Sequence, residues 1–398
     1  MRPMANDGPT VYLDHPATTA CDPRVVEAML PWLTRAGNAA QRAHRSGREA
    51  AEAVAIAREQ VLVSLGIDPA RGEVVLTSGA TEANNLALLG TAARLRTGAR
   101  VVTSTIEHPS VRNVTAALAR RGLDVVSVGV GDDGAVDLDA ALDAIDERTA
   151  LVSVQAVNNE TGVIQPVEAL ARRSREVGAV MHVDAVQSWG KVPLDAAACG
   201  IDLLSISAHK LYGPTGIGAL VAPDRSALDR VSALQLGGGQ ERGLRPGTTN
   251  VAGAVGMGAA AHVAHEAAHE EPLRLQALRE RFEEALLVEV AGARINGQRA
   301  RRGPAITSLS IDGIDALELL AGIPRIAAST SSACSAGAPS HVLRAMGFST
   351  ARARSTVRLG IGRTTTWDEL AIATDLIAHA VAARQPRAAS PARELAPA

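Results

Sequence analysis

The chain has few aromatic residues, no excess of charge and no long apolar run. Its 398 residues include three Trp, two Tyr and two Phe, too few for the aromatic platforms on which nucleic-acid bases stack. The 40 Lys and Arg side chains are balanced by 42 Asp and Glu side chains, which excludes a polycation built to coat nucleic acid. No run approaches the about 18 uncharged apolar residues of a membrane-spanning helix, so we expect no membrane association.

Cysteine is also scarce. Cys21, Cys199 and Cys334 are too few and too scattered for a disulfide scaffold or a zinc site built of thiolates. Residues 1–9 are short and polar and do not resemble a signal peptide. We therefore expect a cytoplasmic protein, in which an isolated thiol is more often a small apolar group than a nucleophile.

Short β-branched runs alternate with helical segments between residues 73 and 223. This alternation predicts an α/β fold with a largely parallel sheet that helices cover on both faces. Several runs are almost entirely apolar, which is typical of strands buried on both sides. The predicted strands are 73–77, 100–104, 123–130, 150–157, 179–183, 203–207 and 218–221, and the predicted helices include 83–96, 111–120 and 167–177.

The pattern changes after Asn250. Residues 251–290 predict one long helix, followed by strands at 305–311 and 356–361 and helices near 314–321 and 366–383. This part predicts a smaller α+β domain. The predicted organisation is an N-terminal segment (1–20), a large α/β domain with a mostly parallel seven-stranded sheet (21–250), a small C-terminal α+β domain (251–383) and a disordered tail (384–398).

Polar residues follow several predicted strands, at the edge where open α/β sheets bind ligands. After the first strand, residues 77–82 (Thr-Ser-Gly-Ala-Thr-Glu) lead into a helix. Such a turn can bind an anion, because the free N–H groups of a helix N-terminus face the ligand. An ordinary helix cap is the simpler interpretation of these residues alone.

Other strand ends supply a histidine, an amide pair, a carboxylate and a lysine. They are His108 before a proline, Asn158 with Asn159, Asp184 and Lys210. Each has an ordinary structural explanation as a partly buried histidine, a turn, a paired acid or a solvated end charge. Together with an anion cradle, they form the set of groups that pyridoxal phosphate needs. The lysine forms its Schiff base and the carboxylate holds its ring nitrogen protonated.

Eight segments, in the same order along the chain, resemble the cysteine desulfurases of the NifS/IscS-like family. These enzymes have the class V aminotransferase fold (fold type I of pyridoxal phosphate enzymes). The resemblance extends from Tyr12 to about Asp368. Ser-Ala-His-Lys and the segment around Cys334 are its most specific parts. The matching segments are 12–19 (Tyr-Leu-Asp-His-Pro-Ala-Thr-Thr), 77–82, 107–109 (Glu-His-Pro), 157–162 (Val-Asn-Asn-Glu-Thr-Gly), 182–188 (His-Val-Asp-Ala-Val-Gln-Ser), 207–214 (Ser-Ala-His-Lys-Leu-Tyr-Gly-Pro), 237–248 (Gly-Gly-Gly-Gln-Glu-Arg-Gly-Leu-Arg-Pro-Gly-Thr) and 331–337 (Ser-Ser-Ala-Cys-Ser-Ala-Gly).

The resemblance implies a role for each matching cofactor residue. Lys210 is implied as the Schiff-base lysine and Asp184 as the partner of the ring nitrogen. Gln187 and Asn159 are implied to lie at the ring oxygen, with Asn159 also near the substrate. His108 is implied to stack on the ring and to move protons. The implied phosphate cup consists of Ala80, Thr81, Ser207 and His209, completed by Thr248 of a neighbouring subunit, so a homodimer is expected.

Substrate binding and sulfur transfer are implied in the same way. Arg358 matches the arginine that binds the carboxylate of L-cysteine, a task that suits its bidentate fork, and Arg363 ranks second. Cys334 lies in a stretch of Ser, Ala and Gly at 327–337, so we expect a mobile loop (about 325–338) of the IscS/NifS length rather than the shorter SufS-like one. Its thiolate would take sulfur from L-cysteine as a persulfide and leave L-alanine. Cys21 and Cys199 are expected to be structural.

Three segments depart from the family pattern. Residues 37–44 lack the Pro or Ser usual before their histidine, His15-Pro16 replaces a smaller or more polar pair, and Pro246 stands where Ser is commoner. His262, His265 and His269 could share a helix face and bind zinc, but a solvated face is the simpler interpretation, and no metal is expected.

The expected partners are L-cysteine and a sulfur-acceptor protein of the scaffold or tRNA-thiolation type, as in iron–sulfur cluster assembly, without direct nucleic-acid binding. Two other functions stay open: a selenocysteine lyase or other carbon–sulfur lyase, and a non-enzymatic cofactor-binding relative. Because aromatic residues are scarce, His108 is expected to cover the cofactor ring alone.

Overall fold

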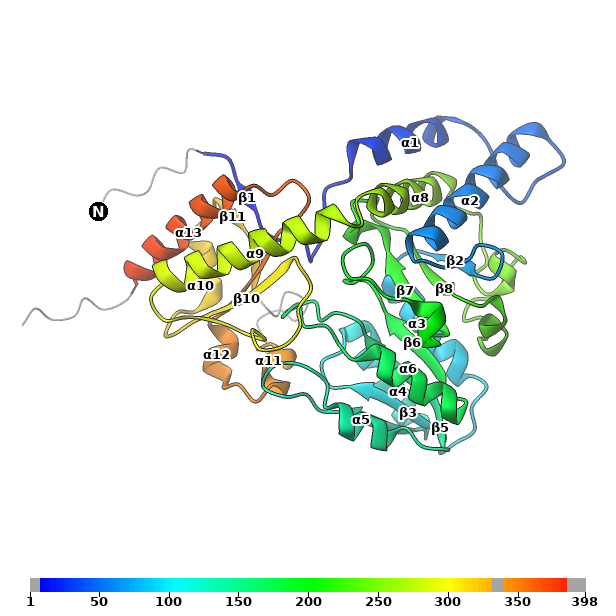
Figure 1. Cartoon of the computed structure of the whole chain (residues 1–398). Coiled ribbons are helices and arrows are strands. Elements are labelled where there is room, and N and C mark those ends of the chain that lie inside the picture. Colours follow the sequence, from blue (N-terminus) through cyan, green and yellow to red (C-terminus); the bar gives the residue numbers. More distant parts are fainter. Residues whose placement is uncertain (1–7, 331–338, 385–398) are drawn as a thin grey trace, which may run out of the picture.

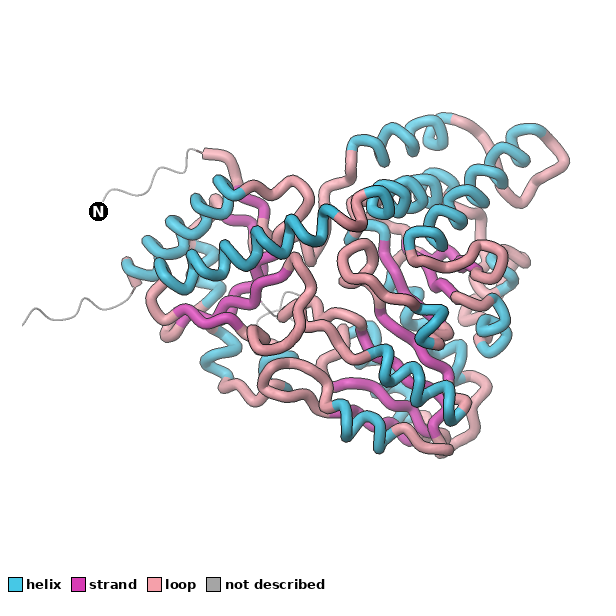
Figure 2. The backbone as a smooth tube through the Cα atoms, viewed as in Figure 1, coloured by secondary structure: helices cyan, strands magenta, loops and turns pink. Residues whose placement is uncertain are grey.

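The structure, a computed structural model, describes residues 8–330 and 339–384. The chain forms two lobes (Figure 1). The large lobe surrounds a seven-stranded sheet and the small lobe surrounds a four-stranded sheet. In each lobe, helices pack against the sheet (Figure 2). No helix in the described ranges combines the length and the apolar content that a membrane span requires.

The sheet of the large lobe is mostly parallel, as the sequence predicts. Its strand order is β2-β8-β7-β6-β5-β3-β4. Only β8 is antiparallel to its neighbours, because the short connection from β7 leaves no room for the crossover that a parallel strand needs. The strands are β2 (Glu73–Thr77), β3 (Arg100–Ser104), β4 (Asp124–Val128), β5 (Thr149–Gln155), β6 (Val180–Asp184), β7 (Leu203–Ser207) and β8 (Gly218–Ala222).

Successive residues of these strands enter two different apolar clusters, since side chains alternate across a sheet. Leu203 of β7 packs with α3 (Ala80–Ala92) and α4 (Pro109–Arg120) on one face. Leu204 packs on the other face with α2 (Arg45–Ser64), α6 (Val167–Val177) and α8 (Val251–Glu266). Shorter helices α5 (Leu138–Ala144) and α7 (Ala196–Cys199) and the 3₁₀ turns η1 (Ala208–Lys210), η2 (Arg225–Arg230) and η3 (Glu241–Gly243) complete the lobe.

The long helix predicted over 251–290 is two helices, α8 and α9 (Glu270–Glu289), separated at 267–269. Met257 and Ala261 of α8 lie in the core of the large lobe, where α8 packs beside α1 (Pro23–Thr34) and α2 (Figure 1). Phe282 of α9 lies in the core of the small lobe. The small lobe therefore begins after α8, later than the predicted residue 251, because the small Ala and Gly side chains of α8 let it pack closely on the large lobe.

The small lobe is an antiparallel sheet covered by two long helices. The strand order is β12-β13-β10-β9, and α9 and α13 pack against its apolar face through Phe282, Leu286 and Leu370. The N-terminal segment joins this lobe, because β1 pairs in parallel with β11 and Leu13 is buried in the same cluster. The elements are β1 (Val11–Tyr12), β9 (Ala293–Ile295), β10 (Ile306–Ile311), α10 (Ala316–Ala321), β11 (Ile326–Ala327), β12 (Ser329–Thr330), α11 (His341–Ala345), α12 (Thr350–Arg354), β13 (Thr356–Gly360) and α13 (Trp367–Ala382).

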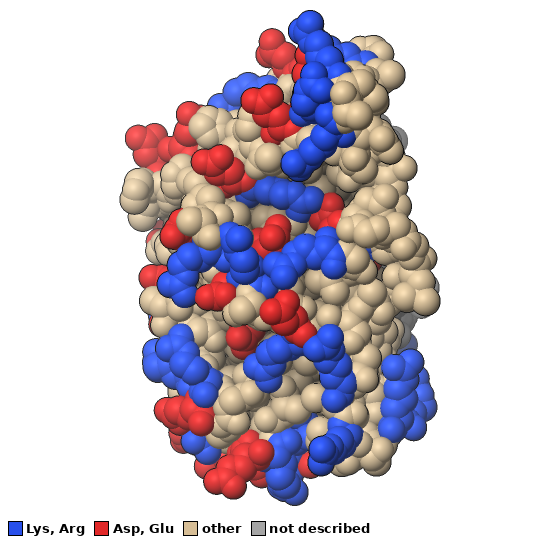
Figure 3. All heavy atoms as spheres, turned by 90° about the vertical axis from the view of Figure 1, so that its right-hand side faces the viewer, with Lys and Arg blue, Asp and Glu red and all other residues tan. Residues whose placement is uncertain are grey.

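Charges of both signs are mixed on the surface. On the face in Figure 3, Lys and Arg side chains lie among Asp and Glu side chains from top to bottom, beside a mostly uncharged area along its right-hand side. The structure contains exposed ion pairs such as Arg71 with Asp224 and Arg148 with Asp146. This face therefore lacks the single-sign field of a nucleic-acid binding surface.

Candidate active site

A cavity of about 550 Å³ lies at the edge of the large sheet, between the two lobes. It is bordered by the ends of β6 and β7, by the N-terminal ends of α3 and α4, by the N-terminal segment and by one arginine of the small lobe. Of the predicted site residues that the structure describes, all except Thr248 lie at this cavity. The predicted residues that line it are Ala80, Thr81, His108, Asn159, Asp184, Gln187, Ser207, His209, Lys210 and Arg358.

Lys210 ends the tight 3₁₀ turn that follows β7, so its position is fixed by a buried strand. Its Nζ donates hydrogen bonds to the carbonyl oxygens of Pro16 (2.7 Å) and Ala17. Gln187 Nε2 donates to the same Pro16 oxygen (2.9 Å). The N-terminal segment therefore closes the cavity over the lysine with backbone carbonyl groups, which no residue type in the sequence could indicate.

His209, between Ser207 and Lys210, also binds the N-terminal segment. Its Nδ1 lies 3.1 Å from Thr18 Oγ1, and its carbonyl oxygen accepts from the Thr19 N–H (2.9 Å). Burial, followed by the charges of Lys210 and Lys191, lowers the pKa of His209 to about 4. His209 is therefore neutral at physiological pH and adds no charge to the cavity.

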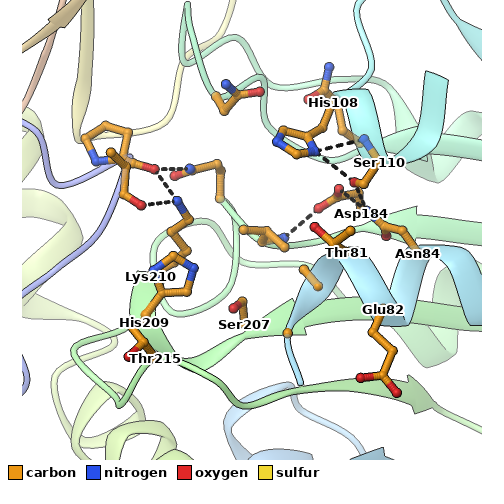
Figure 4. A pocket seen from close by; sticks show the side chains of 18 of the residues that line it. Thr81, Glu82, Asn84, His108, Ser110, Asp184, Ser207, His209, Lys210 and Thr215 are labelled. Carbon is orange, nitrogen blue, oxygen red and sulfur yellow. Dashed lines mark hydrogen bonds between the residues drawn. The ribbon is translucent and has the colours of Figure 1, made fainter. Parts of the chain in front are cut away.

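Asn84, which the sequence did not point to, connects Asp184 with His108. Its Nδ2 donates to Asp184 Oδ2 (2.8 Å) and to Ser110 Oγ (2.9 Å), and Ser110 Oγ lies 2.8 Å from His108 Nδ1. Figure 4 shows these four side chains on one side of the cavity. The Val186 N–H donates to the other oxygen of Asp184 (3.1 Å). Asn84 lies one turn after Ala80 on α3, so helical periodicity was the available signal.

These hydrogen bonds decide which nitrogen of His108 carries the proton. A carboxylate only accepts, so Asn84 presents its NH₂ group to Asp184 and Ser110, and the Ser110 hydroxyl then donates to His108 Nδ1. The Ser110 backbone N–H donates to the same nitrogen (3.2 Å). Burial lowers the pKa of His108; Asp184 raises it and Lys210 lowers it. His108 is thus a neutral imidazole with its proton on Nε2.

The N-terminus of α3 is open to an anion. Its N-cap is Gly79, which provides no side-chain cap, so first-turn N–H groups remain for a ligand. Glu82 accepts from the Ser78 N–H (2.6 Å) and pairs with Arg245 (2.9 Å), which neutralises its charge. Gly79 has φ 153°, a conformation that other residues avoid. A Cβ on Gly218 would lie 2.7 Å from Gly79 Cα, so both positions need glycine.

Arg358 is the described residue by which the small lobe reaches the cavity. It lies within β13, is 4% exposed, and pairs with Asp14 (2.9 Å). Its Nη1 donates to the Asn159 carbonyl oxygen (3.1 Å), while its buried Nε has no partner among the described residues. Arg363, ranked second, is held elsewhere by Asp22 (2.9 Å) and Glu271 (2.7 Å). It does not line the cavity.

Two buried carboxyl groups, those of Glu107 and Glu160, belong to the loops that carry His108 and Asn159. Glu107 accepts from Ser104 Oγ and from the Gln155 N–H (2.9 Å), and burial raises its pKa to about 8. Burial likewise raises the pKa of Glu160, which accepts from Ser340, to about 7. Both lie in segments that resemble the family, but their burial was not predicted, since acidic residues in loops are usually solvated.

The remaining predicted residues take different places. Asn158 is a turn residue, because its Oδ1 accepts from the N–H groups of Glu160 and Thr161 (both 2.9 Å). Thr248 does not line the cavity of the single chain, and Cys334 lies outside the described residues. His262 contacts Glu266 (3.4 Å). Within 8–330 and 339–384, no group of three or more His, Cys, Asp or Glu is placed to hold a metal ion.

Comparison with known proteins agrees with this geometry. Residues 11–372 match the family model of class-V aminotransferases. The chain is 43% identical over 389 residues to cysteine desulfurase IscS of Anaeromyxobacter dehalogenans, covering 97% of this chain and 95% of that protein. A NifS-like protein of known structure superposes with a TM-score of 0.85 at 35% identity, covering 94% of this chain and 99% of that one. SspA in complex with cysteine gives 0.78 at 35% identity, covering 88% and 99%.

Proposed function

The chain belongs to the class-V aminotransferase family and, within it, to the cysteine desulfurases of the IscS and NifS type, and from this we propose how it works. We propose that the cavity binds pyridoxal 5′-phosphate and L-cysteine and releases L-alanine, with the sulfur passed to Cys334. The observation that carries the proposal is one sheet edge that combines Lys210, Asp184 and His108 with an uncapped helix N-terminus.

The donor set fits pyridoxal phosphate. The uncapped N-terminus of α3, with Ser207 and His209 opposite, would hold the phosphate, and the Asp184 carboxylate would hold the ring nitrogen. Gln187 and Asn159 lie on the cavity wall where they would reach the ring oxygen. When bound, the cofactor supplies the electron sink that stabilises negative charge on the substrate α-carbon.

Proton movement is proposed to rest on Lys210 and His108. The Lys210 amine is the candidate base for the α-proton of L-cysteine, because it lines the cavity and shares the Pro16 carbonyl oxygen with Gln187. His108 offers a proton at Nε2 because its Nδ1 is already occupied by Ser110. These two groups let one cavity both remove and supply protons near neutral pH.

Arg358 would bind the substrate carboxylate through its guanidinium. The Cys334 thiolate would then attack the substrate sulfur. The carbon–sulfur bond breaks with its electrons going to carbon, which takes up a proton to give alanine, and a sulfur–sulfur bond forms on Cys334. Thiol plus cysteine thus become persulfide plus alanine, with no external oxidant or reductant.

We further propose a homodimer and a sulfur-acceptor protein, as expected for iron–sulfur cluster assembly. Leu33 is 64% and Leu236 is 94% exposed in the single chain, and such side chains favour burial against a partner. Thr248, close in sequence to Leu236, would reach the cavity of the second subunit. The persulfide sulfur would leave on the acceptor protein.

The test is an assay of alanine formed from L-cysteine by the purified protein. We expect pyridoxal absorbance and one alanine per persulfide sulfur, and loss of turnover in both Lys210→Ala and Cys334→Ala. A Cys199→Ala variant, which changes a thiol outside the cavity, is the control and should keep full turnover. Full turnover by Cys334→Ala would contradict the proposed sulfur transfer.

A further inference from the structure

Lysine is almost absent from this chain. Of its 40 basic residues, only Lys191 and Lys210 are lysines, and every other one is arginine. Lys210 is explained by chemistry, because only a primary amine forms a Schiff base. Lys191 has no such explanation in the proposed reaction. All basic positions apart from these two carry arginine. The lysine at position 191 therefore suggests that this position needs an ammonium group.

Lys191 contacts the reactive lysine directly. It follows Gly190, which has φ 70°, in the turn after β6. Its Nζ donates a hydrogen bond to the carbonyl oxygen of Lys210 (3.0 Å). This carbonyl belongs to the 3₁₀ turn that aims the Lys210 side chain. The side chain of Lys191 therefore supports that turn, and it does not line the cavity itself.

The charges around Lys191 come from several elements. Its positive charge is disfavoured by Lys210 and by Arg363, which lies in the segment after β13. Glu271 of α9 favours it. Lys191 in turn disfavours protonation of His209 and of His15 in the N-terminal segment. Among the described residues no carboxylate forms an ion pair with Lys191. Burial, followed by Lys210, lowers the pKa of Lys191 to about 8.

Arginine would keep a positive charge at this position but would not fit it in the same way. A guanidinium is planar, larger and charged at every physiological pH, whereas an ammonium is compact and can lose its proton when it is desolvated. Lys191 must fit between the Lys210 carbonyl and a small internal cavity that it shares with Gln187 and Tyr212. The geometry thus explains why this position kept lysine in an arginine-rich chain.

We propose that Lys191 is a positioning residue for Lys210. Its Nζ fixes the carbonyl group of Lys210, and its positive charge opposes a second positive charge on the neighbouring amine. The proposal rests on the proposed function, in which Lys210 is the reactive lysine. The first effect holds the turn that carries Lys210 in place, and the second keeps the Lys210 nitrogen ready to accept a proton.

Two lysines make the test unusually direct. Protein labelled only with ¹³Cε-lysine gives two lysine signals in NMR, which Lys191→Arg assigns. We expect the Lys191 signal of the cofactor-loaded protein to titrate well below the about 10.4 of a free lysine. A Lys191 signal that titrates at the free-lysine value would overturn the proposal, and this readout does not depend on turnover.

The second measurement follows the absorbance of the cofactor bound to Lys210 as a function of pH. In Lys191→Met we expect the spectral midpoint to move to higher pH and kcat to fall, because a like charge and a hydrogen bond are lost. In Lys191→Arg the midpoint should stay close to the wild-type value, because the charge remains. Arg301→Met removes a positive charge from the groove beside Lys191 and should change nothing.

An unchanged midpoint in folded Lys191→Met would overturn the proposal. If Lys191→Met does not fold, Lys191→Gln, which keeps a hydrogen-bond donor and lacks the charge, should show the same upward shift. A wild-type protein with no pyridoxal absorbance and no alanine formation would instead contradict the proposed function. The two failures are therefore distinguishable.

Discussion

The two walls of the cavity are built in different ways. The large-lobe wall takes its groups from strand ends and helix starts of one sheet, as with Asp184 at the end of β6 and Lys210 just after β7. The small-lobe wall contributes Arg358 from the middle of an antiparallel strand. In the proposed function, this arrangement would separate cofactor chemistry, at the sheet edge, from substrate recognition, which the second lobe would supply. Mutations on the two walls should therefore differ in kind.

The largest effect is expected on the large-lobe wall. Lys210→Ala removes the proposed base and cofactor anchor and should lower kcat for alanine formation by about 10³-fold or more. Cofactor absorbance should also change. Circular dichroism would check that the fold is intact. Turnover within tenfold of wild type would contradict the role assigned to this wall.

His108→Ala tests the imidazole that is expected to cover the cofactor ring on the same wall. We expect kcat to fall by about 10²-fold, since a positioned proton donor is lost, and the cofactor to bind more weakly, since no aromatic residue replaces the imidazole. Equilibrium dialysis of the cofactor measures the second effect. Wild-type affinity for the cofactor would show that His108 does not cover the ring.

Arg358→Ala tests the small-lobe wall. A charge-assisted contact to the substrate carboxylate is lost, so kcat/KM for L-cysteine should fall by about 10- to 100-fold, mainly through KM. The matched control is Arg363→Ala, which breaks pairs with Asp22 and Glu271 outside the cavity and should affect stability rather than KM. An equal rise of KM in both variants would remove the distinction between the two arginines.

Ser110→Ala and Asn84→Ala test how the large-lobe wall is tuned. Each weakens the hydrogen bonding that keeps His108 Nδ1 unprotonated, so the pKa of His108 should rise. The loss of one such hydrogen bond should lower kcat by about fivefold. ¹⁵N NMR of labelled histidine reports both the tautomer and the pKa. A His108 signal with its proton on Nδ1 in the wild type would refute this hydrogen-bond chain.

The smallest effect concerns stability. Burial raises the pKa of Glu107 in the folded protein to about 8, from an ordinary value of 4.5. Between these pH values the unfolded chain releases a proton that the folded chain keeps, so stability falls as pH rises from about 4.5 to 8. Glu107→Gln should flatten this decline, as measured by urea unfolding at pH 5 and pH 8. The exposed Glu49→Gln is the control, and equal pH dependence in wild type and Glu107→Gln would contradict the assignment.

The sequence predicted the residues of the large-lobe wall better than the residues that hold them in place. Strands such as Leu203–Ser207 are continuous apolar runs, and the polar residue after each one is visible in the sequence. The break between α8 and α9 was missed because residues 267–269 contain no Gly or Pro, although Pro272 in the first turn of α9 was an available signal. Asn84 and the carbonyls of Pro16 and Ala17 were missed because their partners are distant in sequence.

The most direct test of the account asks which lysine carries the cofactor. Borohydride reduction of the purified protein fixes a Schiff base, and mass spectrometry of its peptides locates the modified residue. The chain offers only Lys191 and Lys210 for this reaction. We expect the pyridoxal group on Lys210 and an unmodified Lys191. Modification of Lys191, or no modification of either lysine, would contradict this assignment.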